Sequence, residues 1–248
     1  MKLPWLEPGD PFPPASQAWD ESEPAPGLLA AGGSLDVQTL HCAYSSGIFP
    51  WFSEGQPILW WSTHPRMVLY ARELKLHRSL RKTIARFASE PRCEIRFDAS
   101  FSKVIRACSA SPRTGQSGTW IVPQMVRAYE AFHRAGFAHS VETWIDGELA
   151  GGLYCIVIGR AVFGESMFMR VPDASKIALA ALCAWCRHHN IDFIDCQQNT
   201  RHLASLGGRE IGREHFVAQV AQNAVLTAPA FEFLPVYWDE LLPRKPTA

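Results

Sequence analysis

The segment between residues 139 and 196 constrains the fold of this 248-residue chain most strongly, because its strands and its one helix follow in a fixed order. Apolar residues alternate with others in three consecutive stretches, which predicts strands over residues 139–145, 149–158 and 161–167. Asp146-Gly147 marks a tight turn between the first two strands. An apolar helix is predicted over 175–189, followed by a strand over 191–196. This β-β-β-α-β order predicts an open mixed sheet and an α/β (α+β) fold class.

The last predicted strand places a carboxylate and a carboxamide two residues apart, in Asp195-Cys196-Gln197. Because side chains alternate along a strand, Asp195 and Gln197 are predicted to share one face, while Cys196 points to the other face, toward the core. Such a pair suits the handling of a polar, proton-bearing group better than a metal or a phosphate. The alternative is a buried polar pair that caps the following helix.

Glu165 is a second acid near the end of an apolar predicted strand. If the two strand ends are neighbours, Glu165 and Asp195 converge on one site; the alternative for Glu165 is a surface salt bridge. Gly164-Glu165-Ser166-Met167-Phe168 begins like the nucleophile elbow of a serine hydrolase, but the second glycine is missing and no helix signal follows. Cys196 as a nucleophile is also disfavoured, because strand alternation turns it toward the core.

Outside this segment, we predict a small N-terminal domain over residues 1–70, while the larger domain spans 71–248. Residues 1–26 are rich in proline and acidic residues and should form an extended arm over the surface. Ser34 is predicted to be the N-cap of a helix over 35–46. Further elements predicted in the larger domain are a strand at 94–97 and helices over 101–108 and 123–135.

An amphipathic helix is predicted over residues 73–88, where apolar residues recur at helical spacing. Its other face carries five basic residues: Lys75, Arg78, Arg81, Lys82 and Arg86. The formal net charge of the chain is zero, so any attraction for nucleic acid must be local. The basic face is either a solvated helix surface or a footprint for a phosphate backbone.

The seven cysteines are odd in number and scattered, which fits free thiols in a reducing cytoplasm better than a disulfide framework. Cys183 and Cys186 form a C-x-x-C pattern late in the predicted apolar helix. No second pair stands at zinc spacing, so we predict core cysteines and no metal site. The N-terminus has no apolar signal region, and the stretch 177–186 is too short to span a bilayer. We therefore expect a cytoplasmic protein without a membrane partner.

Several tryptophans lie close to prolines or glycines, where aromatic side chains often stack on flat ligands such as nucleobases. They are Trp51, Trp60, Trp61 and Trp120. The alternative for each of them is a place in the core or at an interface.

Nine motifs that occur in one order carry a resemblance to a known family. They are Gly32-Gly33-Ser34-Leu35, Tyr44-Ser45-Ser46-Gly47-Ile48-Phe49-Pro50-Trp51, Trp60-Trp61-Ser62, Pro65-Arg66, Gly118-Thr119-Trp120-Ile121, Gly164-Glu165-Ser166-Met167-Phe168, Ala174-Ser175-Lys176, Asp195-Cys196-Gln197 and His202-Leu203-Ala204-Ser205-Leu206-Gly207. Together they resemble the bacterial leucyl/phenylalanyl-tRNA–protein transferase family over residues 27–216.

This resemblance implies a small N-terminal domain and a GCN5-related N-acyltransferase-like domain with a mixed sheet. It implies an enzyme that moves leucine, phenylalanine or methionine from aminoacyl-tRNA to the N-terminal Arg or Lys of a protein. The new peptide bond would mark that protein for degradation as an N-degron. No metal, coenzyme A or other cofactor is implied, and the helix over 175–189 lacks the glycine-rich loop that coenzyme A would need. Nothing in the sequence demands more than a monomer.

The resemblance also implies roles for single residues. Asp195 and Gln197 are the catalytic candidates: Asp195 would orient or polarise and accept charge, and Gln197 would hold the attacking amine by its carbonyl oxygen. Glu165 would bind an amino group, and Trp51 and Trp120 would contact the terminal adenosine of the tRNA. The donor side chain would enter an apolar pocket made of Leu153, Val162, Leu179, Leu182 and Ile194. The basic face would touch the acceptor stem.

Three other functions stay open on the residues alone. The first is an aminoacyl transferase of the same fold with another acceptor, such as a peptidoglycan-bridge enzyme. The second is an RNA-binding module without chemistry, and the third is a coenzyme A-dependent acetyltransferase. Binding of a 3′-aminoacyl adenosine would argue against coenzyme A, and turnover would separate an enzyme from a module.

Overall fold

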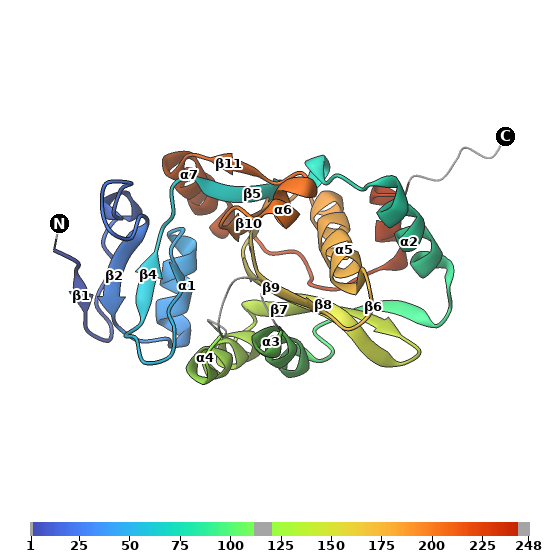
Figure 1. The fold of residues 1–248 in the computed structure, drawn as a ribbon, viewed down its shortest axis with the longest axis horizontal. Helices are drawn as coiled ribbons and strands as arrows, with labels where there is room; N and C mark the ends of the chain where they lie inside the picture. Colours follow the sequence, from blue (N-terminus) through green and yellow to red (C-terminus); the bar gives the residue numbers. More distant parts are fainter. Residues whose placement is uncertain (1, 112–120, 243–248) are drawn as a thin grey trace.

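The computed structural model describes residues 2–111 and 121–242, which form two β-sheets surrounded by helices (Figure 1). The smaller sheet has the strand order β1-β2-β4-β3. Its strands are β1 (Trp5–Leu6), β2 (Leu28–Gly32), β3 (Phe49–Pro50) and β4 (Leu59–Trp61). Part of the predicted arm joins this sheet, because β1 pairs in parallel with β2. A short 3-10 helix, η1 (Ala15–Gln17), follows within the arm, and Phe12 packs edge-on against Trp60.

Helix α1 (Val37–Ser45) lies between β2 and β3, and its N-cap is Asp36. The Asp36 side chain accepts a hydrogen bond from the backbone N–H of Thr39 at 2.9 Å, while the Ser34 hydroxyl donates to the Asp36 carboxylate. The prediction of Ser34 as the cap was therefore wrong by two residues. A carboxylate accepts both hydrogen bonds at once, which lets the aspartate take the capping position.

The larger sheet has the strand order β11-β5-β10-β9-β8-β7-β6. Its strands are β5 (Arg66–Tyr70), β6 (Cys93–Phe97), β7 (Ala138–Ile145), β8 (Glu148–Ile158), β9 (Ala161–Met169), β10 (Phe193–Gln197) and β11 (Arg209–Ile211). β9 and β10 run parallel, whereas all other neighbours in this sheet are antiparallel, so the predicted mixed sheet is confirmed. The turn between β7 and β8 has positive φ at both Asp146 and Gly147, as a two-residue hairpin with right-handed twist requires.

Strand β5 belongs to the larger sheet, although the sequence placed it in the small N-terminal domain. It pairs with β10 on one side and with β11 on the other. The chain passes from one sheet to the other between Trp61 and Arg66. We therefore propose a domain boundary at residues 62–65 in place of residue 70. The alternation along residues 66–70 identifies a strand, but it holds no information on which sheet that strand joins.

The helices cover both faces of the larger sheet (Figure 1). The core on one face is shared with α2 (Arg78–Ser89), α5 (Ala174–His188) and η3 (Pro235–Glu240). The core on the other face is shared with α1, α3 (Phe101–Ala110), α4 (Pro123–Arg134) and α7 (Arg213–Ala224). Neighbouring residues of the central strands alternate between the two cores: Leu153 packs in the first and Tyr154 in the second.

Helix α2 begins at Arg78, five residues later than predicted. It is preceded by a short 3-10 helix, η2 (Ala71–Glu73), and by a connecting segment. In that segment the Lys75 N–H donates to the carbonyl oxygen of Leu206 at 2.8 Å. Leu206 is the C-cap of α6 (Arg201–Ser205), so tertiary pairing with α6 replaces the first helical turn. Within the described residues, no helix has the length and apolar character needed to cross a membrane.

Candidate active site

The sheet carries two irregularities, one in the middle of β9 and one at the carboxyl end of β10. The parallel ladder between these strands is limited to two residue pairs, Val162–Ile194 and Phe163–Asp195. Beyond it, Glu165 is an extra residue on β9 opposite β8, and Cys196 is an extra residue on β10 opposite β5. Such bulges bend a strand and redirect its side chains, and they are common beside active sites. Residues from both bulges line one cavity.

This cavity has a volume of about 430 Å³. Its apolar wall includes Phe49, Trp51, Leu153, Met167, Leu179, Leu182, Ile194 and Leu203. Its polar lining includes Glu165, Ser166, Gln197, Gln198, Thr200 and His202. A largely apolar wall with a few polar groups suits a ligand that has an apolar side chain and a polar, reacting end.

Four of the five predicted pocket residues line the cavity, namely Leu153, Leu179, Leu182 and Ile194. Val162 does not, and in this the prediction was wrong. Val162 is 1% exposed and packs in the core shared with α5, because it lies inside the β9–β10 ladder. Positional matching identified the correct wall but not how far the cavity reaches into the sheet.

Asp195 does not line the cavity; its carboxylate is fully buried and paired with Arg66 of β5. Arg66 Nε lies 2.8 Å from Asp195 Oδ1, and Arg66 Nη2 lies 2.6 Å from Oδ2. The guanidinium also lies over the rings of Phe49 and Phe216, at 4.7 and 4.4 Å from their centroids. Arg66 therefore joins β10 to residues of β3 and α7 in the centre of the molecule.

The predicted directions of the Asp195-Cys196-Gln197 side chains were partly wrong. Ile194 and Cys196 line the cavity, while Asp195 points away from it, as alternation requires. Gln197 lines the cavity too, because its backbone has a φ of +55° and the strand bulges there. That conformation is uncommon for a residue other than glycine. Asp195 Oδ1 accepts the Gln197 N–H at 3.0 Å, so the buried carboxylate holds Gln197 in place.

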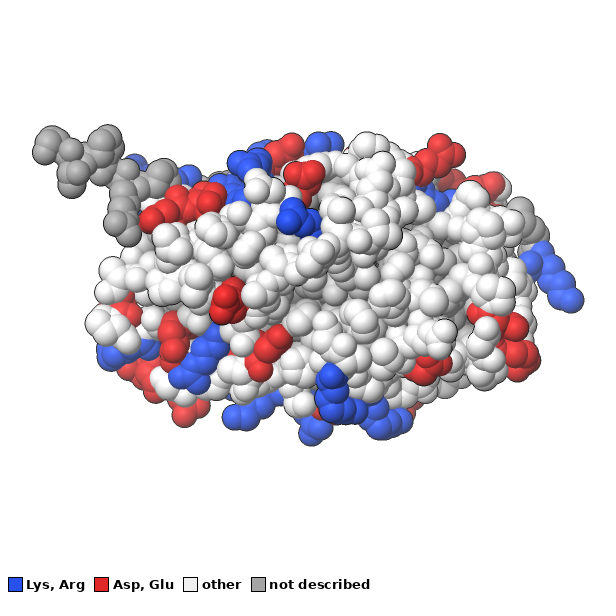
Figure 2. Space-filling view, turned by 180° about the vertical axis from the view of Figure 1, so that it is seen from behind, with Lys and Arg blue, Asp and Glu red and all other residues white. Residues whose placement is uncertain are grey.

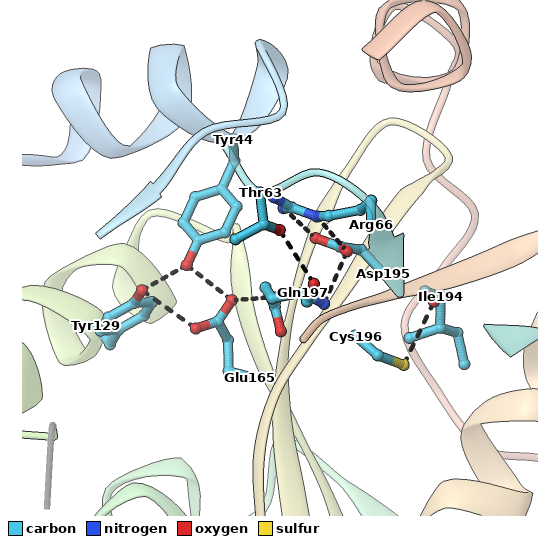
Figure 3. A network of polar contacts seen from close by, with 9 residues as sticks. All are labelled: Tyr44, Thr63, Arg66, Tyr129, Glu165, Ile194, Asp195, Cys196 and Gln197. Carbon is cyan, nitrogen blue, oxygen red and sulfur yellow. Dashed lines mark hydrogen bonds and ion pairs between the residues drawn. The ribbon is translucent and has the colours of Figure 1, made fainter. Parts of the chain in front are cut away.

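Glu165 meets Gln197 at the cavity wall (Figure 3), whereas Asp195, the acid expected to converge with it, lies behind the wall beside Arg66. Gln197 Nε2 donates to Glu165 Oε1 at 3.3 Å. Tyr44 of α1 donates to Oε1 at 2.8 Å, and Tyr129 of α4 donates to Oε2 at 3.4 Å. The Tyr129 hydroxyl has one proton, which it can give either to Oε2 or to the neighbouring Tyr44 hydroxyl, and both tyrosines are fully buried. The carboxyl group thus lies among neutral donors from three other elements.

Burial raises the pKa of Glu165 to about 8. The hydrogen bond from Tyr44 lowers this pKa, the negative charge of Asp195 raises it, and the positive charge of Arg66 lowers it. Burial also raises the pKa of Tyr44 and Tyr129, so both hydroxyls stay protonated and can donate. Glu165 therefore changes its protonation state at mildly alkaline pH.

The tryptophans differ in their surroundings. Trp51 lines the cavity, and its carbonyl oxygen accepts a hydrogen bond from Trp61 Nε1 at 2.7 Å. Trp60 is fully buried in the core. Trp120 lies outside the described residues.

All five predicted tRNA-binding side chains are exposed. Four of them lie on α2, whereas Lys75 lies in the segment before it. None of the ion pairs between described residues involves any of the five. The start of α2 abuts α6, because His77 Nε2 lies 3.2 Å from the Ser205 carbonyl oxygen, and α6 lines the cavity with His202 and Leu203. Figure 2, which views the molecule from behind the view of Figure 1, shows that charged side chains are sparse across the middle of that side.

Sequence reasoning missed the partners of the two acids: Arg66, Tyr44 and Tyr129. Arg66 and Tyr44 stood within quoted motifs, and a basic residue inside an apolar strand signals a buried counter-charge. Tyr129 had no such signal, because only the packing of α1 against α4 brings it to Tyr44. In α5, Cys183 and Cys186 are buried free thiols, as predicted for core cysteines. The two described ranges contain no group of His, Cys, Asp and Glu placed to hold a metal ion.

Comparison with known proteins identifies the family. A model described as "Leucyl/phenylalanyl-tRNA protein transferase" matches residues 68–221, and a model of the N-terminal domain of the same transferase matches residues 33–64. A leucyl/phenylalanyl-tRNA–protein transferase from Polaromonas sp. (strain JS666) is 62% identical over 246 residues, which is 99% of this chain and 96% of the relative. Relatives with the same name are 62% identical in Albidiferax ferrireducens, covering 97% of this chain and 94% of the relative, and 55% identical in Leptothrix cholodnii, covering 98% and 97%.

The two matched segments together include every residue that lines the cavity. The chain therefore belongs to the leucyl/phenylalanyl-tRNA–protein transferase family.

Proposed function

We propose that this protein transfers leucine or phenylalanine, and also methionine, from aminoacyl-tRNA to the N-terminal Arg or Lys of acceptor proteins. The observation that carries the proposal is the cavity, in which an apolar wall ends at the paired polar groups Glu165 and Gln197. Family membership supports the same reaction. The product would carry an N-degron, and we propose that the reaction takes place in the cytoplasm, where charged tRNA is available. A monomer suffices for this chemistry.

The apolar wall supports selection of the donor by its side chain. Leu153, Leu179, Leu182 and Ile194 offer only hydrocarbon surface to a ligand, which favours unbranched, γ-branched and aromatic side chains over polar ones. Discrimination by size alone is modest, about 1–3 kcal/mol per methylene group. We therefore expect several apolar amino acids to be accepted.

The chemistry needs orientation more than a strong base. A free α-amine has a pKa of about 7.7–8.0, so part of it is already neutral at pH 7. Holding this amine against the ester in attack geometry supplies much of the lowering of the barrier. In our proposal the carbonyl oxygen of Gln197 holds the amine, while Asp195 fixes Gln197 and stabilises positive charge that develops near it.

The donor tRNA would place its 3′ end in the cavity and its acceptor stem along α6 and α2. The contacts of His77 and Lys75 with α6 put the basic face next to the cavity wall. Trp51 would then stack on the terminal adenosine, and Trp120 is proposed to do the same.

The direct test is transfer of radiolabelled leucine from charged tRNA to two peptides that differ only in an N-terminal Arg or Ala. We expect label on the Arg peptide alone. Label on both peptides would contradict acceptor selection, and label on neither, with intact tRNA binding, would contradict the proposed reaction.

Replacing Cys196 by alanine should change the rate of transfer by less than about threefold, because the thiol is part of the wall and not a nucleophile. Burial raises the pKa of Cys196 above its usual range, so it carries no thiolate near neutral pH. The rate of the variant is measured as single-turnover transfer of leucine to the Arg peptide. Loss of transfer by a folded Cys196→Ala protein would instead indicate covalent catalysis.

A further inference from the structure

The proposed reaction must move one proton from the attacking nitrogen to the departing oxygen of the tRNA. Among the described residues of the cavity wall, Glu165 is the acidic side chain, and Asp195 lies behind the wall in its ion pair with Arg66. Three other titratable groups line the cavity: His202, Cys196 and the phenol of Tyr154. Burial holds the pKa of His202 below its usual value and raises that of Cys196, so neither changes protonation at mildly alkaline pH.

The position of Glu165 suits contact with the attacking amine. Gln197 Nε2 donates to Glu165 Oε1, so the carbonyl oxygen of the same amide is free of this contact and can hold the amine. Only the Gln197 amide group would separate an amine held by that oxygen from the Glu165 carboxylate. Gln197 itself cannot take the proton, because a neutral carboxamide is a very weak base.

From this geometry we propose that Glu165 accepts the proton of the attacking amine and then returns it to the leaving ribose oxygen. The proposal rests on the function proposed above and assigns the proton acceptor within it. The nitrogen lone pair forms a bond to the ester carbon, and the carbonyl π electrons move to oxygen. The Glu165 carboxylate takes one proton from nitrogen. When the carbonyl re-forms, the bond from carbon to the ribose oxygen breaks, that oxygen receives the proton, and Glu165 is a carboxylate again.

The elements around Glu165 supply hydrogen-bond donors for its carboxylate. Tyr44 of α1 contacts Oε1, Tyr129 of α4 contacts Oε2, and Gln197 of β10 is a third donor, to Oε1. The nearby charges are those of Asp195 and Arg66, which largely offset each other as an ion pair. The pKa of about 8 at Glu165 nearly matches that of an α-amine, so proton transfer in either direction is almost isoenergetic.

The first test compares Glu165→Gln with Glu165→Asp in single-turnover transfer of leucine to the Arg peptide. The glutamine keeps the shape and its one carbonyl oxygen can still accept from a tyrosine, but it cannot take a proton. We expect Glu165→Gln to lower the rate about 10²–10⁴-fold. Glu165→Asp should retain more activity, because it keeps a carboxylate. A Glu165→Gln rate within threefold of the native rate would overturn the proposal.

The second test uses the pH dependence and separates Glu165 from the amine of the acceptor, whose pKa is similar. The native rate should rise with pH and level off above pH 8, because the carboxylate is the active form. Tyr44→Phe removes a hydrogen bond that lowers the pKa of Glu165, so the midpoint of the rise should move up by about 1 pH unit. Tyr129→Phe should move it in the same direction.

Tyr237→Phe is the matched control, because its buried hydroxyl contacts His189 and not Glu165. This variant should leave the midpoint where it is. A midpoint that Tyr44→Phe and Tyr129→Phe both leave unchanged would mean that the amine alone titrates, and it would overturn the proposal. If the native protein itself transfers no leucine to the Arg peptide, the proposed function fails as well; native transfer that does not depend on Glu165 overturns the proton role alone.

Discussion

Asp195→Ala is expected to lower the rate of transfer by about 100-fold or more and to reduce the free energy of unfolding by about 3–5 kcal/mol. The loss of stability follows from Arg66, which is fully buried and would keep its charge without a counter-ion. The rings of Phe49 and Phe216 on the guanidinium can stabilise it only in part, by about 2 kcal/mol for a desolvated contact.

The loss of activity has a different physical cause. Asp195 Oδ1 accepts both Arg66 Nε and the Gln197 N–H, and the second of these holds Gln197 in its left-handed conformation. Without this hydrogen bond, the backbone of Gln197 can relax toward the extended conformation that residues other than glycine prefer. Its amide would then leave the cavity wall and its contact with Glu165. Binding of tRNA should remain nearly intact, because Asp195 does not line the cavity.

A double variant separates the two effects. Arg66→Met combined with Asp195→Leu replaces the buried ion pair with apolar side chains, which is often neutral or stabilising. We expect it to recover most of the stability in a urea titration while transfer stays as low as in Asp195→Ala. If transfer returned together with stability, Asp195 would be purely structural. Equal loss of tRNA binding and transfer in a folded Asp195→Ala protein would point to the same conclusion.

The outline of the larger domain could be predicted because its strands are long and regular. Strands β7, β8 and β9 begin and end within two residues of the prediction, and the positive φ at Asp146 and Gly147 confirms the turn. Helix α2 was placed less well. α2 begins later than its apolar spacing indicates, because the Lys75 N–H pairs with Leu206 across the fold. A local pattern does not contain such a contact.

The residues of the site could be predicted from the sequence, but the directions of their side chains could not. Asp195, Gln197 and Glu165 lie together, yet Asp195 and Gln197 do not share one face as strand alternation predicted, because a bulge after Asp195 breaks the two-residue period and turns Gln197 to the side of Cys196. Bulges depend on hydrogen bonds to neighbouring strands, and the chain gives no local signal for them. Arg66 was quoted only as part of a motif, and its role follows from pairing of β5 with β10, which are more than a hundred residues apart.

The basic face of α2 leads to the second large expected effect. Arg78, Lys82 and Arg86 follow one another at four-residue spacing on the side of the helix opposite to the buried Leu80 and Ile84. Arg81 is less suited to a test, because its Nη1 donates to the Leu241 carbonyl oxygen and a change there would also disturb the C-terminal segment. The double variant Arg78→Glu with Lys82→Glu therefore reverses two charges while disturbing the structure least.

This variant reverses two charges and should weaken binding of every donor tRNA by about 1,000-fold at low salt. A phosphate contact at about 4 Å in water is worth about 1 kcal/mol, and reversal of the charge turns that attraction into a repulsion of similar size. The slope of log affinity against log salt should fall by about 0.7–0.9 for each lost contact. Lys2→Glu with Lys103→Glu is the control, because both lysines are exposed and the change in net charge is identical.

Filter binding of charged and uncharged tRNA between about 50 and 200 mM salt measures both quantities. If the control pair weakened binding as much as the α2 pair, the effect would arise from net charge and not from a local footprint. An unchanged salt slope in the α2 variant would remove this helix from the tRNA surface. A reduced slope with normal transfer at saturating tRNA would show that α2 contributes affinity, while selection of the donor lies with the apolar wall that Leu153 and Leu182 help to form.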